Sequence, residues 1–221
     1  MTNVPACCAK ENVPADGEAA YGWLIGASGG SGRDGFDIHV FASILALSLA
    51  EARRAGETLA ARCGLGGAEL AMLARDMFPG AAGDLADSAG EAEADVDAEE
   101  QSVRDILLMY ASGASDLERP LAAMIARRCK EPHHLWQDLG LNDRSELSRL
   151  MVRHFAPLKA RNSADMKWKK FLYRMVCSSE GFTLCTAPVR SDCDDFEVCF
   201  GDEDGEARLL RAGNPRGEAV A

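Results

Sequence analysis

Four cysteines follow one another within 23 residues near the C-terminal end of the chain, as Cys177, Cys185, Cys193 and Cys199. Their thiolates are soft ligands that bind zinc or the iron of an iron–sulfur cluster. Glycine and proline interrupt this segment, so the sequence predicts an irregular loop over residues 177–201 that folds back and points several sulfurs at one centre. This loop is the first candidate for a metal-binding site.

The spacing of these cysteines leaves several chemistries open. Zinc sites commonly use pairs of cysteines separated by two to four residues, whereas the gaps here are seven, seven and five residues. An iron–sulfur cluster contains several irons, so it accommodates wider gaps between its cysteine ligands more easily. Disulfides are disfavoured because thiols stay reduced in the cytoplasm. Zinc, an iron–sulfur cluster and cysteines without a stable metal remain as alternatives.

A basic segment leads up to the first of these cysteines. Nine basic and only two acidic residues lie between residues 144 and 174, a local charge of +7 in a chain whose net charge is −11. Helical spacing places Lys167, Lys170 and Arg174 on one face, just before Cys177. Cations favour the thiolate form of a nearby cysteine, and they attract a small oxyanion or an acidic partner. The plainer interpretation is a solvated helix face.

A further cysteine and three histidines are better explained by structural roles than by a functional site. Cys129 continues the apolar face of a helix, which predicts a buried core thiol. We interpret His133, His134 and His154 as packed or surface histidines. The chain has no dinucleotide-binding, phosphate-loop, zinc-protease or nucleophile-elbow motif. We therefore do not expect an enzyme.

The elements that must position the cysteine loop are predicted to be helices. Apolar residues recur at helical spacing, and no strand-like alternation is longer than four residues. The sequence thus predicts an all-α bundle of about six helices, over residues 37–63, 68–78, 103–110, 120–129, 143–158 and 164–176. Asp143, three residues before Glu146, resembles a capping box at the start of the fifth helix.

Composition divides the 221 residues into four parts. Hydrophobic residues make up 47% of the chain, which is enough for a core. Low apolar content or charge runs predict disorder at both ends and a solvated linker in the middle. The expected parts are a disordered segment 1–35, a helical domain 36–176 with an acidic linker at 84–100, the loop 177–201 and a disordered tail 202–221.

Charge and hydropathy exclude two classes of partner. A net charge of −11 argues against a general nucleic-acid binder, which needs a basic surface. The longest nearly apolar run, residues 40–50, is shorter than the ~20 residues that span a bilayer. The N-terminus has no secretory pattern. We therefore expect a cytoplasmic protein with no membrane and no nucleic-acid partner.

The sequence from residue 132 onward is similar to a known family. The stretch HLWQDLGLNDRSELSRLMVRHFAPLKARNSADMKWKKFLYRMVC, followed by EGFTLC-TAP and CDDFEVCFG, resembles NifQ, the molybdenum-handling family of nitrogen-fixing bacteria. The resemblance covers most of residues 37–201. The combination of the Met-Lys-Trp-Lys-Lys-Phe segment with the cysteine loop is specific to this family.

This resemblance implies a function in nitrogen fixation. Family members are iron–sulfur, metal-binding proteins that act as metallochaperones: they bind molybdenum and deliver it for FeMo cofactor biosynthesis. The expected receivers are the assembly scaffold NifEN and the nitrogenase reductase NifH. By resemblance, Cys185, Cys193 and Cys199 are metal ligands.

The chain departs from the family pattern at one position. The family's loop usually reads Cys-x4-Cys-x2-Cys-x5-Cys, and its second cysteine corresponds to Arg190 here. Arginine has no lone pair to offer a metal. Either Cys177 supplies a fourth thiolate, or the cluster has three thiolates and an open or oxygen-bound corner. The arginine, together with the basic helix face, would instead pair with molybdate.

Overall fold

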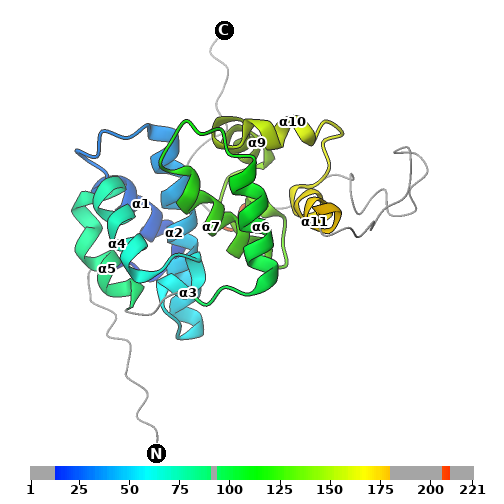
Figure 1. The fold of residues 1–221 in the computed structure, drawn as a ribbon. Helices are drawn as coiled ribbons and strands as arrows, with labels where there is room; N and C mark the ends of the chain where they lie inside the picture. The colour runs from blue at the N-terminus through cyan, green and yellow to red at the C-terminus, as the bar shows by residue number, and fades with distance from the viewer. Residues whose placement is uncertain (1–12, 91–93, 180–205, 210–221) are drawn as a thin grey trace, which may run out of the picture.

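The computed structural model describes residues 13–90, 94–179 and 206–209, and all regular structure among them is helical. The elements are α1 Gly17–Ala27, α2 Gly35–Ala55, α3 Leu59–Cys63, α4 Gly67–Met77, the 3-10 helix η1 Pro79–Ala81, α5 Ala82–Ala89, α6 Ala98–Met109, α7 Glu118–Cys129, α8 Leu135–Asp138, α9 Arg144–His154, α10 Ala156–Arg161 and α11 Trp168–Ser179 (Figure 1). The prediction of an all-α fold is confirmed for these residues.

The predicted number of helices is too low for the described residues, because α1, α5 and α8 were not predicted and because glycine and proline divide two of the predicted helices. Gly56 ends α2 in the left-handed conformation, with φ at 69°, so the helix predicted over 37–63 becomes α2 and α3. Pro157 has no N–H for the helical hydrogen bond four residues back. The helix predicted over 143–158 therefore breaks into α9 and α10.

Helix α2 forms the centre of the core. Almost every residue from Val40 to Ala52 is buried, and α1 and α3 pack against this helix. In Figure 1, α2 lies between α1, α4 and α5 on one side and α6 and α7 on the other. By length and composition α2 is apolar enough to cross a membrane, but 83% of its apolar window is buried inside the protein. An apolar helix at this position is what a core requires.

The prediction of disorder over residues 1–35 is wrong for the residues that the structure describes. Asp16 caps α1 by accepting a hydrogen bond from the backbone N–H of Ala19 at 2.8 Å. Ala20 and Leu24 of α1 are fully buried against α2. The segment is ordered because α2 supplies the apolar surface that its few hydrophobic side chains need. Residues 1–12 lie outside the described part.

The acidic linker predicted over residues 84–100 is helical at both of its ends, with residues 91–93 outside the described part. Leu85 and Ala89 of α5 are fully buried, and α6 begins at Ala98. Glu100 is fully buried because Arg104 and Arg127 pair with its two carboxylate oxygens, at 2.6 and 2.7 Å. A buried, paired carboxylate cannot be distinguished by composition from a solvated one.

Candidate metal centre

Helix α11 carries the described part of the predicted metal site. Its inward face consists of Trp168, Phe171, Leu172 and Val176, all of which are buried. Trp168 and Phe171 meet edge to face with their ring centroids 5.7 Å apart. The helix packs against α6 and lies at the periphery of the fold, below α10 in Figure 1. The sequence predicts Trp168, Phe171, Leu172 and Met175 on this face; the first three are confirmed, whereas Met175 is only partly buried and Val176 is buried instead.

The boundary between helix and loop lies further along the chain than predicted. The helix continues to Ser179, so Cys177 belongs to α11 and not to a loop beginning at residue 177. Its thiol is partly exposed. Cys185, Cys193 and Cys199 lie outside the described residues, as does Arg190.

Two cations share a helix face with this thiol. Lys170 and Arg174 are both exposed, and they precede Cys177 by seven and three residues. Side chains three and four residues apart are neighbours on a helix surface. Arg174 is therefore the nearer of the two cations, one turn before Cys177, and Lys170 lies one turn further back on the same face.

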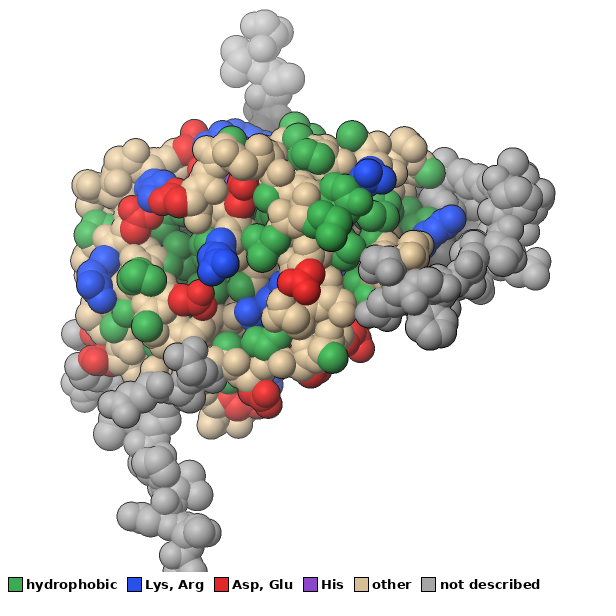
Figure 2. Space-filling model, in the orientation of Figure 1, with side chains coloured by type: hydrophobic (Ala, Val, Ile, Leu, Met, Phe, Trp, Pro, Cys, Tyr) green, Lys and Arg blue, Asp and Glu red, His purple; other side chains and the backbone are tan. Residues whose placement is uncertain are grey.

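Carboxylates pair with four of the nine basic residues of the segment 144–174, so the segment offers fewer unpaired cations than its composition indicates. The pairs are Arg144 with Asp165, Arg153 with Asp37, Lys159 with Asp165, and Lys169 with Asp138. Lys167 is half-buried and already has an interaction. Figure 2 shows acidic side chains between the basic ones on the visible face. The available cations of α11 are therefore Lys170 and Arg174.

The other described thiols are unsuited to binding metal. Cys63 and Cys129 are both buried, which confirms the prediction of a core thiol at Cys129. Burial raises the pKa of Cys63 to about 11 and that of Cys129 to about 12, so both stay protonated. Among the residues that the structure describes, no group of three potential ligands could hold a metal ion.

The histidines serve as links between helices. His39 accepts or donates at both ring nitrogens, with Tyr21 Oη at 2.9 Å and Glu146 Oε2 at 3.1 Å. Buried His154 contacts Asp37 Oδ1 at 3.0 Å. The prediction of packed histidines holds for His154, whereas the bridging position of His39 was not predicted.

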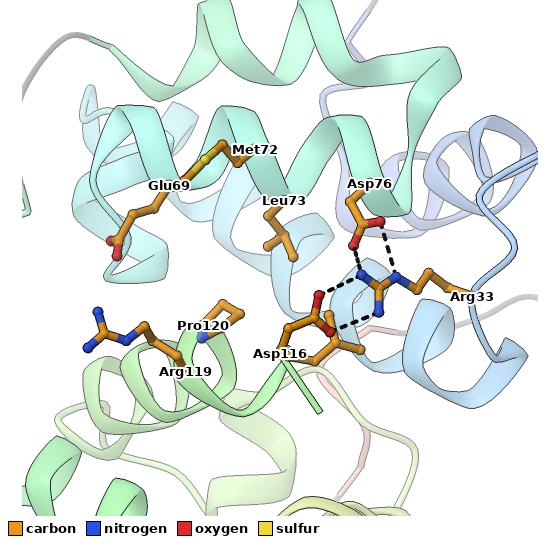
Figure 3. A pocket seen from close by; sticks show the side chains of 9 residues that line it. Arg33, Glu69, Met72, Leu73, Asp76, Asp116, Arg119 and Pro120 are labelled. Atoms are coloured by element: carbon orange, nitrogen blue, oxygen red, sulfur yellow. Dashed lines mark hydrogen bonds and ion pairs between the residues drawn. The ribbon is translucent and has the colours of Figure 1, made fainter. Parts of the chain in front are cut away.

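One described cavity lies far from α11. It has a volume of about 400 Å³ and is bordered by α4, the start of α7 and Arg33. Figure 3 shows the Arg33 guanidinium between the carboxylates of Asp76 and Asp116, which it joins at 2.7 and 2.8 Å. These two ion pairs raise the pKa of Arg33. The cavity is thus bordered by ion pairs that tie neighbouring segments together, and α4, which lines it, lies on the opposite side of Figure 1 from α11.

Sequence reasoning missed a charged cluster that joins α11 to the C-terminal residues. Asp138 is fully buried, and its carboxylate accepts hydrogen bonds from Lys169 of α11 and from Arg208. The predicted disordered tail 202–221 is therefore wrong for residues 206–209, which dock on the core. No local sequence pattern predicts these two ion pairs, because the partners are 31 and 70 residues apart.

Together these features define a small protein whose described residues form helices only, and whose helix α11 presents a partly exposed thiol beside two cations. The family model for NifQ matches residues 40–201. The chain is 38% identical over 172 residues to a protein NifQ homolog of Sinorhizobium fredii, covering 78% of this chain and 75% of that protein. It is 44% identical over 163 residues to protein NifQ of Rhodobacter capsulatus, covering 72% and 87%. The chain belongs to the NifQ family.

A third relative, protein NifQ of Azotobacter vinelandii, is 36% identical over 103 residues, which cover 47% of this chain and 53% of that protein. No solved structure matches the chain. The family match includes the four cysteines of residues 177–199 and leaves out both α1 and residues 206–209.

Proposed function

We propose that this chain is a molybdenum carrier that holds an iron–sulfur cluster and delivers molybdenum for assembly of the nitrogenase iron–molybdenum cofactor. The observation that carries the proposal is membership of the NifQ family, with a match that extends through all four cysteines of residues 177–199. The role in nitrogen fixation and in FeMo cofactor biosynthesis follows from that membership.

As a carrier the protein releases a metal instead of turning over a substrate. The proposed receivers are NifEN and NifH, and the proposed compartment is the cytoplasm. This assignment fits the described part of the chain, where the site is an open helix end with a thiol rather than an enclosed pocket.

The proposed ligands are Cys177, Cys185, Cys193 and Cys199. Soft thiolates match the iron of a sulfide cluster. Cys177 supplies the thiolate that the family pattern would place at Arg190. Its partial exposure and its place in the last turn of α11 support this role. When bound, the cluster would supply sulfide and thiolate ligands that replace oxygen around molybdenum.

The cations at this helix end have a role in capturing molybdenum, which arrives as a doubly charged oxyanion. Lys170 and Arg174 raise the local anion concentration beside Cys177. Arg190 pairs with the oxyanion inside the cysteine segment, since a guanidinium binds anions but cannot ligate a metal.

Metal content tests the proposal directly. The native protein, Cys177→Ser and Cys129→Ala would be purified without air from molybdate-supplied cells, and iron, molybdenum and zinc would be measured per chain. We expect iron and molybdenum in the native protein and in Cys129→Ala, which removes a buried thiol. We expect both metals to be lost from Cys177→Ser.

Other outcomes identify other functions. Iron that stays bound and undergoes reversible reduction, without any molybdenum, would indicate a small electron-transfer protein. Zinc alone would indicate a zinc-stabilised interaction module. Iron and molybdenum that persist in Cys177→Ser would show that three thiolates suffice.

A further inference from the structure

Residues 206–209 contact the core as a short peptide ligand would, and Arg208 makes the strongest of these contacts. Its guanidinium donates from Nη1 to Asp138 Oδ1 at 2.8 Å and from Nη2 to Glu51 Oε1 at 2.6 Å. Both carboxylates are buried, with exposed fractions of 0% for Asp138 and 8% for Glu51. One guanidinium therefore bridges two buried carboxylates that α8 and α2 supply.

The same segment has an apolar contact and a backbone contact. Leu209 is buried at 2% exposure. A Cβ added at Gly17 of α1 would lie 2.5 Å from Leu209 Cδ2, and one added at Gly140, after α8, would lie 2.8 Å from Leu209 Cδ1. The two glycines thus leave the space that the leucine occupies. Gln137 Nε2 donates a hydrogen bond to the backbone carbonyl of Glu206 at 2.9 Å. A cation, a leucine and a backbone carbonyl are therefore all recognised.

The core does not need Arg208 for its own charge balance. Arg128 pairs with the other oxygen of Glu51, and Lys169 pairs with the other oxygen of Asp138. Two cations thus already oppose two carboxylates without Arg208. The segment can therefore leave without stranding an unpaired buried charge, which would otherwise be costly.

The site that holds the segment lies within the family domain and beside α11. Glu51 and Asp138 belong to residues 40–201, which the NifQ family model matches, whereas residues 206–209 lie beyond the match. Lys169 of α11 contacts the same Asp138 carboxylate as the docked segment. The site is thus separable from its present occupant, and it adjoins the helix that carries the partly exposed thiol.

We propose that α1, α2 and α8 form a docking site for a partner protein, and that the site binds an extended segment in which leucine directly follows arginine. Residues 206–209 occupy this site in the unbound chain and leave when the partner binds. Charge complementarity identifies the cation, because a planar guanidinium can bond two carboxylates at once and an ammonium is a point charge. The space beside Gly17 and Gly140 identifies the leucine. The proposal makes no use of the cysteines.

The test uses a synthetic peptide as the probe and the full-length chain as the receptor. The peptide is fluorescein-Glu-Ala-Arg-Leu-amide, which has the sequence of residues 206–209, and binding is followed by fluorescence anisotropy. We expect saturable binding to Arg208→Gln/Leu209→Ser, whose own segment no longer docks. The parent protein should bind the peptide at least about tenfold more weakly, because the apparent affinity falls with the fraction of vacant sites.

Two controls locate the binding. A peptide with glutamine in place of arginine should not bind, and this control leaves the protein unaltered. Adding Gly17→Leu to the double variant should abolish binding of the arginine peptide, because the new side chain fills the space beside α1. Gly22→Leu is the matched control in the same helix, since nothing lies within 4 Å of a Cβ added there. This variant should bind the peptide like the double variant.

Each alternative result contradicts part of the proposal. Absence of saturable binding to Arg208→Gln/Leu209→Ser, or equal binding of the arginine and glutamine peptides, would overturn the site. Equal affinity in the parent protein would overturn the competition by residues 206–209. A parent chain that sediments as a dimer and becomes monomeric in the double variant would assign the site to a second copy and overturn the partner. None of these results bears on iron or molybdenum content, which tests the carrier proposal separately.

Discussion

Arg208 donates a hydrogen bond to the buried carboxylate of Asp138 across 2.8 Å, although the two residues are 70 positions apart in the chain. The same carboxylate receives Lys169 at 2.5 Å and the backbone N–H of His133 at 3.1 Å. One buried anion therefore organises three segments: the turn before α8, helix α11 and residues 206–209. The contribution of this carboxylate to stability follows from the two cations that its removal would leave unneutralised.

Asp138→Asn should destabilise the protein by about 3 kcal/mol, because it leaves Lys169 and Arg208 beside a group that no longer neutralises them. Asp116→Asn is the matched control. Asp116 pairs with Arg33, but its side chain is 70% exposed, so the loss there should stay below about 1 kcal/mol. Urea unfolding of the two variants measures the difference. Equal midpoints would mean that the buried pairs contribute no more than the surface pair.

Gly140, beside Leu209, should tolerate alanine poorly. Gly140 has φ at +69°, and an added Cβ would lie 2.7 Å from the carbonyl oxygen of Ser43. Gly113 has φ at +68° with nothing within 4 Å of an added Cβ. Gly113→Ala therefore carries only the cost of a left-handed alanine, about 1 kcal/mol. Gly140→Ala adds the clash and should cost about 3 kcal/mol. Thermal unfolding that ranked the two variants equally would contradict the close packing of Leu209.

Local patterns predicted much of this fold. Asp143 accepts hydrogen bonds from the backbone N–H groups of Ser145 and Glu146, at the helix start that the sequence predicted. Trp168, Phe171 and Leu172 of α11 are also buried where helical periodicity placed them. Such features involve residues within one or two turns of each other, so their signals are local.

The missed features depend on contacts between distant segments. Leu24 is fully buried, yet α1 has too few apolar residues to predict order until α2 is placed beside it. The carboxylate partners of Lys169 and Arg153 come from α8 and α2, so a local count of charges overestimated the basic face. The docking of residues 206–209 was missed because Leu209 and Leu210 form a single apolar pair in a largely polar tail.

The three described thiols should differ sharply in reactivity. Burial raises the pKa of Cys63 to about 11 and that of Cys129 to about 12, so neither forms a thiolate at pH 8. Cys177 is partly exposed and lies near two cations. Iodoacetamide at pH 8 should therefore modify Cys177 in the native protein and reach the other two only in urea. Peptide mass spectrometry reports each site, and alkylation of native Cys129 at the rate of Cys177 would contradict its burial.

Acid should weaken the link between α2 and α9. Burial would raise the pKa of Glu146, but hydrogen bonds from His39 and Asn142 outweigh it and lower the pKa from 4.5 to about 2. A lowered folded-state pKa stabilises the protein above pH 4.5, and this stabilisation is lost as the pH falls from 4.5 towards 2. Glu146→Gln should be less stable at pH 7 and should lose less stability over that range. Urea midpoints at pH 7, 4.5 and 3 measure both effects, and parallel losses in the two proteins would exclude Glu146 as the titrating group.

Molybdate capture by α11 can be separated from general electrostatics. Lys170→Glu/Arg174→Glu changes the charge by −4 on the face that leads to Cys177. Arg75→Glu/Arg119→Glu makes the same change at exposed arginines of α4 and α7. If the cations beside the thiol concentrate the oxyanion, the first pair should reduce molybdenum per chain at least about threefold, and more strongly at low salt. The second pair should have little effect, because its charges are distant from the thiol. Equal losses in both variants would assign the effect to net charge, and unchanged loading in a folded Lys170→Glu/Arg174→Glu protein would remove these residues from the capture step.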